Sequence, residues 1–130
     1  MRVNKFSIFK YRGKDRRIFK KSKGYVGFVD EHHVIPQQHK NHFVLKKIKY
    51  DMNSNFNLFI MPNSKAKNYI NLHPDTLIHR NHPKYNKFVK LNLDMINKKC
   101  RTNDEIEYNI WLFVNFLKDN LVFNKDNIPW

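Results

Sequence analysis

The stretch Glu31-His32-His33-Val34-Ile35-Pro36 decides the fold, because it carries two adjacent histidines out of a predicted strand and into a loop. Just before it, Gly24–Val29 is rich in β-forming residues and predicts a short strand that ends at Asp30-Glu31. The proline that closes the stretch stops regular strand pairing. On extended backbone, neighbouring side chains point to opposite faces, so we expect His32 and His33 to have different surroundings.

Downstream, the pattern predicts a second strand and then two helices. Leu58–Met61 predicts the strand, whereas Phe43–Leu45 fits either a strand or a helical turn. A helix is predicted from Pro83, because apolar residues follow at helical spacing and proline suits the first helical position. Another is predicted over about residues 103–118, opened by the capping box Thr102–Glu105. The order of elements predicts an α+β fold.

The charge of the chain points to a polyanionic partner. It holds 25 Lys and Arg against 11 Asp and Glu, a net charge of +14, with a pI near 10.0. The excess is concentrated in residues 1–50, with 14 basic and 3 acidic side chains. Such a chain favours nucleic acid, because neutralised phosphates release counterions. The alternatives are charge that serves only solubility and an anionic membrane surface. The most basic stretch, residues 10–23, has no clear apolar face, which disfavours the membrane.

At 130 residues the chain has room for one domain. We expect a basic N-terminal arm over residues 1–23, in which residues 10–23 form an arm or hairpin, followed by a single domain over 24–130. Aromatic residues make up 15% of the sequence and are expected to fill much of the core. The single cysteine, Cys100, excludes an internal disulfide and a cysteine-based zinc site. Together with the absence of a signal-like or membrane-spanning run, it predicts an intracellular protein, in cytoplasm, nucleoid or nucleus; use as a secreted toxin stays open.

Four of the seven histidines suit a metal-assisted phosphodiesterase. His32 and His33 are adjacent, so one can bind a metal while the other faces water. His79 and His82 are three residues apart at the start of a predicted helix and can share a face. Asn57 opens the second strand, where its amide can tie down the histidine loop. The remaining histidines, His39, His42 and His73, are assigned structural or surface roles.

Three blocks of the sequence resemble the AHH family of the HNH (ββα-metal, His-Me finger) nuclease superfamily. The blocks are Glu31–Pro36, Asn57–Pro62 and His79–Asn86, and they occur in the family's order on about residues 24–95. The sequence departs from the family at Glu31, which stands where alanine is expected, and in the short His-x-x-His spacing of the last block. The resemblance implies a ββα-metal core with an additional C-terminal helix.

The resemblance also implies roles for the residues that match. His33 would be the general base and Asn57 its positioner, whereas His32, His82 and His79 would bind one divalent ion, Mg²⁺, Mn²⁺, Ni²⁺ or Zn²⁺. His79 alternatively contacts phosphate. The products would carry 5′-phosphate and 3′-hydroxyl ends. Basic residues of the N-terminal arm would bind the phosphate backbone without sequence specificity: Arg12, Lys14, Arg16, Arg17, Lys20, Lys21 and Lys23.

The sequence therefore predicts a metal-dependent endonuclease that hydrolyses phosphodiester bonds, with double-stranded DNA favoured as substrate and RNA left open. The alternative is a non-catalytic basic protein that binds nucleic acid, which would bind equally well without a divalent ion. A second copy of the chain and an inhibitor protein stay open as protein partners.

Overall fold

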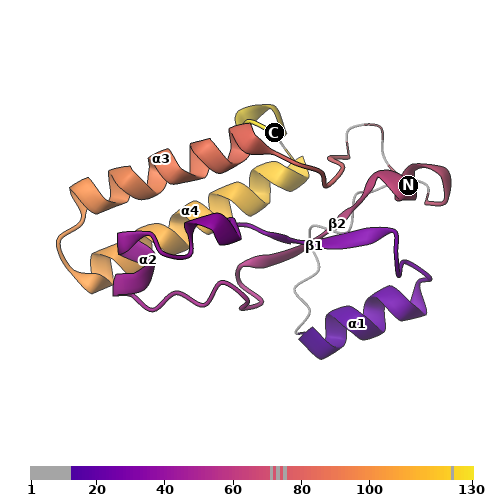
Figure 1. Ribbon diagram of the computed structural model, residues 1–130, viewed down its shortest axis with the longest axis horizontal. Helices are drawn as coiled ribbons and strands as arrows, with labels where there is room; N and C mark the ends of the chain where they lie inside the picture. The colour runs from indigo at the N-terminus through magenta and orange to yellow at the C-terminus, as the bar shows by residue number, and fades with distance from the viewer. Residues whose placement is uncertain (1–12, 71, 73, 75, 124) are drawn as a thin grey trace.

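The computed structural model describes residues 13–70, 72, 74, 76–123 and 125–130. Its helices and strands follow the order α1 (Gly13–Ser22), β1 (Val29–His33), α2 (Phe43–Lys47), β2 (Leu58–Pro62), α3 (Pro83–Lys99) and α4 (Asn103–Phe123) (Figure 1). Short 3₁₀ turns lie at Gln37–His39, Ser64–Asn68 and Lys125–Asn127. A β-hairpin followed by helices confirms the predicted α+β fold, including the additional C-terminal helix. The open choice at Phe43 is resolved as a helix.

The hairpin divides the molecule into two sides. β1 and β2 pair antiparallel with His32 opposite Phe59 and Glu31 opposite Ile60. Because opposed residues share a face, His32 lies on the face that Phe59 presents to the main core, while Ile60 packs with Val29 on the other face. Helices α3 and α4 lie on one side of the hairpin and α1 lies on the other (Figure 1). The two adjacent histidines therefore point to different sides of the hairpin.

The first strand begins later than the sequence predicted. Gly24 and Gly27 have positive φ values of 70° and 87°, and the Phe28 amide donates to the Tyr25 carbonyl over 2.8 Å. Positive φ at both glycines turns the chain, so the β-forming residues between them cannot pair. The strand starts only at Val29, and it includes both histidines.

The described part of the basic segment is a helix and not a hairpin, which was one of the two predicted forms. Lys and Arg are good helix formers, and α1 ends where the Gly24 amide donates to the Lys21 carbonyl and the Tyr25 amide to the Lys20 carbonyl. This pair of bonds around a glycine with positive φ is a Schellman motif. The sequence signal was Gly24 itself, directly after the run of basic residues. The Lys20 ammonium lies 3.9 Å from the Glu31 carboxylate, beside β1.

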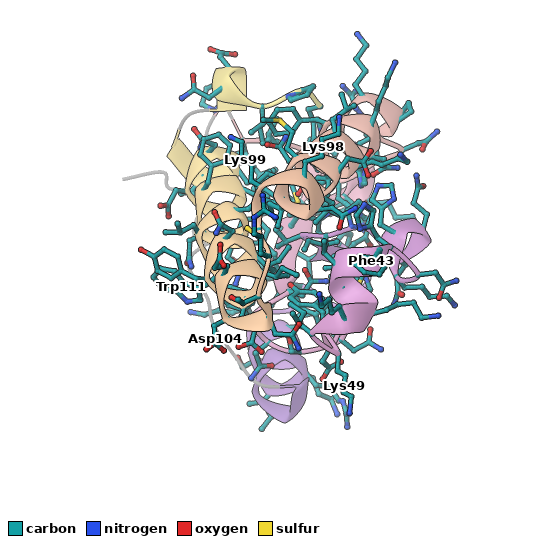
Figure 2. The ribbon with its side chains drawn as sticks, turned by 90° about the vertical axis from the view of Figure 1, so that its left-hand side faces the viewer. Phe43, Lys49, Lys98, Lys99, Asp104 and Trp111 are labelled. Atoms are coloured by element: carbon teal, nitrogen blue, oxygen red, sulfur yellow. The ribbon has the colours of Figure 1, made fainter. Side chains whose placement is uncertain are left out.

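The main core is aliphatic rather than aromatic, contrary to the prediction from composition. Its buried members come from the hairpin and the loops around it, from α2, α3 and α4, and from the C-terminal segment. Of these members in the described ranges, only Phe59, Tyr85 and Phe113 are aromatic. Several large rings are exposed instead, on opposite sides of the molecule: Phe43 on α2 and Trp111 on α4 (Figure 2). α4 extends beyond the predicted end at residue 118, because Leu121 continues its buried face. None of the helices within the described ranges is long and apolar enough to cross a membrane.

The Thr102 half of the predicted capping box is present at the start of α4, and the two side chains also bond each other. The Glu105 amide donates to the Thr102 hydroxyl over 3.1 Å, and that hydroxyl donates to the Glu105 carboxylate over 3.1 Å. We predict that Thr102→Ala lowers the free energy of unfolding by about 1 kcal/mol, because an N-terminal amide loses its acceptor. Thr102→Ser should retain the wild-type value. Urea unfolding followed by circular dichroism measures both, and equal stability of the alanine and serine variants would contradict the assignment.

Candidate active site

Three histidines converge on the core-facing side of the hairpin. His32 is 1% exposed, and its ring centroid lies 5.2 Å from that of His79 and 5.0 Å from that of His82. One ring nitrogen from each of the three falls within 4.8 Å of the others. The structure thus brings together the three residues that the sequence predicted as metal ligands.

Two backbone features place the late histidines beside β1. The His79 amide donates to the Pro62 carbonyl over 2.7 Å, so the loop before α3 runs against the end of β2. His82 is the residue that precedes the first turn of α3, with Pro83 at the first helical position. The short His-x-x-His spacing suffices because His79 lies against the hairpin and His82 at the helix start, rather than both on one helix.

Each late histidine is oriented by a second side chain. The Nδ1 atom of His79 lies 2.9 Å from the Asp30 carboxylate, and the Nδ1 atom of His82 lies 2.9 Å from the Asn86 Oδ1 atom. Each of these oxygens accepts a hydrogen bond from the N–H group at Nδ1, which leaves the Nε2 atom of each histidine with a free lone pair. Partners of this kind fix the tautomer and direction of histidines that bind metals.

Asp30 and Asn86 were not predicted from the sequence, although both had a signal. Asp30 precedes His32 by two residues on the same strand, so the two share a face. Asn86 follows His82 by four residues at the start of a helix, where such residues are neighbours.

Both ring nitrogens of His32 are buried and have no hydrogen-bond partner among the described residues. Burial lowers the pKa of His32 well below 6.5, and the neighbouring His82, His79 and His33 lower it further. Burial also lowers the pKa of His82, opposed by its hydrogen bond to Asn86. Neutral imidazole is the form that binds metals. A buried ring without a partner, beside two oriented rings, therefore fits a divalent cation.

Aromatic rings close the far side of this cluster. The Trp130 ring centroid lies 5.3 Å from that of His32 and 4.8 Å from that of His82, and its indole N–H donates to the Ile78 carbonyl over 3.1 Å. Tyr85 is fully buried against both histidines and donates its hydroxyl proton to the Val34 carbonyl. These rings restrict rotation of the histidines and exclude water from one side of them.

His33 lies on the other face of β1 and is partly exposed. Its Nε2 atom is 3.0 Å from the Asn53 Oδ1 atom and 3.0 Å from the Gln37 Nε2 atom. Neither partner was predicted from the sequence. Both lie in segments between β1 and β2, where the polar composition did not indicate which side chains would contact His33.

The side chain of Asn57 hydrogen-bonds the backbone of the loop that follows His33. Its fully buried amide donates to the carbonyls of Ile35 and Met52, over 3.2 and 2.9 Å, and accepts from the Ile35 amide over 2.8 Å. The Tyr50 hydroxyl donates to the same oxygen over 2.7 Å. Asn57 therefore joins the loop that follows the histidine pair to the loop that precedes β2.

The other predicted residues fall into two groups. Of the basic residues, Arg17, Lys21 and Lys23 are exposed and Lys20 is partly buried, whereas Arg12 and the side chains of Lys14 and Arg16 lie outside the described residues.

Of the histidines assigned structural roles, His39 bonds the Asn86 carbonyl over 2.8 Å and His42 bonds Asp94 over 2.7 Å. The bonds of His39 and His42 join the α2 region to α3. His73 lies outside the described residues.

A β-hairpin with adjacent histidines on β1, followed by a helix with another histidine at its start, defines a ββα-metal nuclease core. Residues 16–110 match a family described as a nuclease family of the HNH/ENDO VII superfamily with conserved AHH. The chain belongs to this AHH family, whose superfamily hydrolyses phosphodiester bonds, and its substrate is therefore nucleic acid. No curated protein and no solved structure matches the chain.

The lowered pKa of His32 predicts that the metal-free protein loses stability in mild acid. Below about pH 6.5 the unfolded chain takes up a proton at this ring while the folded chain resists it, so protons favour unfolding. Between about pH 7.5 and 5.5 we expect a loss on the order of 1 kcal/mol from this group. Urea unfolding with a chelator present measures it, and His32→Leu should show a smaller loss over the same range. An equal loss in both proteins would refute the prediction.

Proposed function

We propose that this nuclease is a metal-dependent endonuclease in which His33 is the general base and His32, His79 and His82 hold one divalent ion. The observation that carries the proposal is His32. Its two ring nitrogens are buried without partners among the described residues, and one of them lies within 4.8 Å of a ring nitrogen of each of two oriented histidines. Its neighbour His33 is partly exposed on the adjacent strand position, where substrate can reach it. Double-stranded DNA is the substrate we propose, because the charge of the chain suits a dense phosphate backbone.

The chain's own residues would divide the reaction between two faces of β1. His33 would take a proton from the attacking water at a ring nitrogen, which requires the neutral ring. His32, His79 and His82 would supply three neutral nitrogen donors, with Asp30 holding His79 and Asn86 holding His82. When bound, the ion supplies charge that stabilises the phosphate oxygens of the transition state and the leaving 3′ oxygen. The products would be 5′-phosphate and 3′-hydroxyl ends.

The donor set narrows the choice of ion. Three imidazoles suit Zn²⁺ or Ni²⁺ better than Mg²⁺ or Mn²⁺, which prefer oxygen ligands. We propose a late first-row transition ion, with Mg²⁺ as the weakest activator. Hydrolysis of a plasmid in the presence of each ion, after treatment with a chelator, ranks them.

We predict that the two kinds of histidine separate in their effects. His33→Ala should lower kcat on duplex DNA by about 100-fold or more while leaving Ni²⁺ affinity nearly unchanged, since general-base catalysis contributes about 10²–10⁴-fold. His32→Ala and His82→Ala should weaken Ni²⁺ binding and activity together. Quenching of Trp130 fluorescence reports binding directly, because this ring packs on His82. The exposed Trp111 is removed in all proteins by Trp111→Phe.

The matched control is His42→Asn, which removes a histidine outside the cluster and keeps a side chain that can accept at the start of α2. It should retain both activity and Ni²⁺ affinity. Wild-type Ni²⁺ affinity in His32→Ala and His82→Ala would refute the metal site. Metal-independent binding of DNA without cleavage would instead favour the non-catalytic alternative.

We also propose that α1 and the residues after it bind phosphates. Replacing Lys21 and Lys23 by glutamine should weaken duplex binding and make the salt dependence shallower, by about 0.9 in the log–log slope for each phosphate that is no longer neutralised. The control replaces Lys98 and Lys99, which are exposed at the end of α3 that lies away from α1 (Figures 1 and 2). Binding by fluorescence anisotropy at several salt concentrations measures the slope. Equal effects of the two pairs would remove α1 from the interface.

A further inference from the structure

We propose that Asn53 is a positioning residue for His33: its side-chain oxygen holds the Nε2–H group, so that Nδ1 is the atom that accepts the proton from water. This inference rests on the proposed role of His33 as the base. It adds to that role the identity of the accepting nitrogen and the residue that selects it.

Three polar atoms form a triangle at the exposed edge of β1. The Asn53 Oδ1 atom lies 3.0 Å from His33 Nε2 and 3.2 Å from Gln37 Nε2, and the two nitrogens lie 3.0 Å apart. A carbonyl oxygen only accepts, and an amide nitrogen only donates. The Asn53 oxygen can therefore accept one hydrogen bond from His33 and another from Gln37 at the same time.

The proton on neutral His33 has two possible positions, and only one leaves a competent base. With the proton on Nε2, the ring donates to Asn53, Gln37 donates to the same oxygen, and Nδ1 keeps a free lone pair. With the proton on Nδ1, the Nε2 lone pair accepts from Gln37 and faces the Asn53 oxygen at 3.0 Å, lone pair against lone pair. That second form has no open nitrogen for a water proton, because Nδ1 is protonated and Nε2 is covered by the Gln37 amide.

The first form also matches the charge that develops during reaction. When Nδ1 accepts a proton the ring becomes a cation, and its Nε2–H bond to Asn53 strengthens because the donor is charged. The Asn53 oxygen therefore stabilises the product of proton transfer more than its reactant. The two side chains that lie within 3.0 Å of the His33 ring among the described residues, Asn53 and Gln37, both lie at Nε2, which leaves Nδ1 for water.

The backbone holds Asn53 in place, although its side chain is exposed. Its amide donates to the Asp51 carboxylate over 3.0 Å, and the carbonyl of the preceding residue, Met52, accepts from the buried Asn57 amide over 2.9 Å. The same Asn57 bonds Ile35, two residues after His33. One buried side chain thus fixes the distance between the strand that carries the base and the loop that carries its partner.

The kinetic test compares Asn53→Leu, which removes the acceptor, with Asn53→Asp, which keeps an oxygen in the same place. Asn53→Leu should lower kcat by about 10- to 100-fold, the usual effect of losing such a supporting partner. KM and Ni²⁺ affinity should stay near wild type, and Asn53→Asp should recover most of kcat. The matched control Asn97→Leu, an exposed asparagine on α3, should change nothing. Unchanged kcat in Asn53→Leu, or failure of Asn53→Asp to recover it, would overturn the proposal.

The spectroscopic test reads the tautomer without any turnover. Long-range ¹H–¹⁵N correlation spectra of the metal-free protein, with the His33 signals assigned by their loss in His33→Ala, should show the proton on Nε2 in wild type. Asn53→Leu should shift the population towards Nδ1–H. A wild-type ring protonated on Nδ1 would overturn the inference even if the enzyme cleaves DNA. If the tautomer is as proposed but His33→Ala cleaves normally, the proposed function fails and this assignment of the proton stands.

Discussion

The amide of Asn57 is the constraint on which the site depends. A fully buried amide is stable only when its donors and acceptor are satisfied, and Asn57 meets this by bonding Ile35, Met52 and Tyr50. Replacing Asn57 with an apolar residue would lower the free energy of unfolding by more than the hydrogen bonds themselves contribute, because the buried backbone atoms that it bonds would be left unpaired. The partners lie on two stretches of chain that are distant in sequence, so a single side chain holds the loop after the histidine pair against the loop before β2.

The alternation of side chains along β1 then separates two chemical environments on adjacent residues. His32 faces the core, where burial and neighbouring rings favour its neutral form, and His33 faces polar side chains and solvent. A metal ligand benefits from the first environment, since water and protons compete with an ion for the imidazole lone pair. A general base needs the second, because it must meet the attacking water. For the roles proposed for His32 and His33, the regular alternation of the strand supplies both environments.

Local patterns in the sequence predicted the fold class, whereas the resemblance to the AHH family implied which histidines would gather. Adjacent residues on a strand must face apart, and a proline with helical spacing behind it marks a helix start. Prediction failed where the deciding feature was a backbone angle or a distant contact. Positive φ at Gly24 and Gly27 moved the strand and ended α1, and Trp130 reaches the cluster from far along the chain. Asn53 meets His33 across an irregular segment, a pairing that no periodicity indicates.

The ring of His32 has no hydrogen-bond partner within the described part of the chain, and so departs from the rule that buried polar groups find partners. An unmet buried group costs about 1–3 kcal/mol, and here the surrounding core is packed well enough to hold it, since Val34, Ile35 and Tyr85 are fully buried. A ligand that binds only the folded chain offsets such a cost by mass action. On the proposed metal role, the stability given up at His32 in the metal-free protein would be recovered when a metal binds, which would account for a neutral, buried histidine where an apolar residue would fold better.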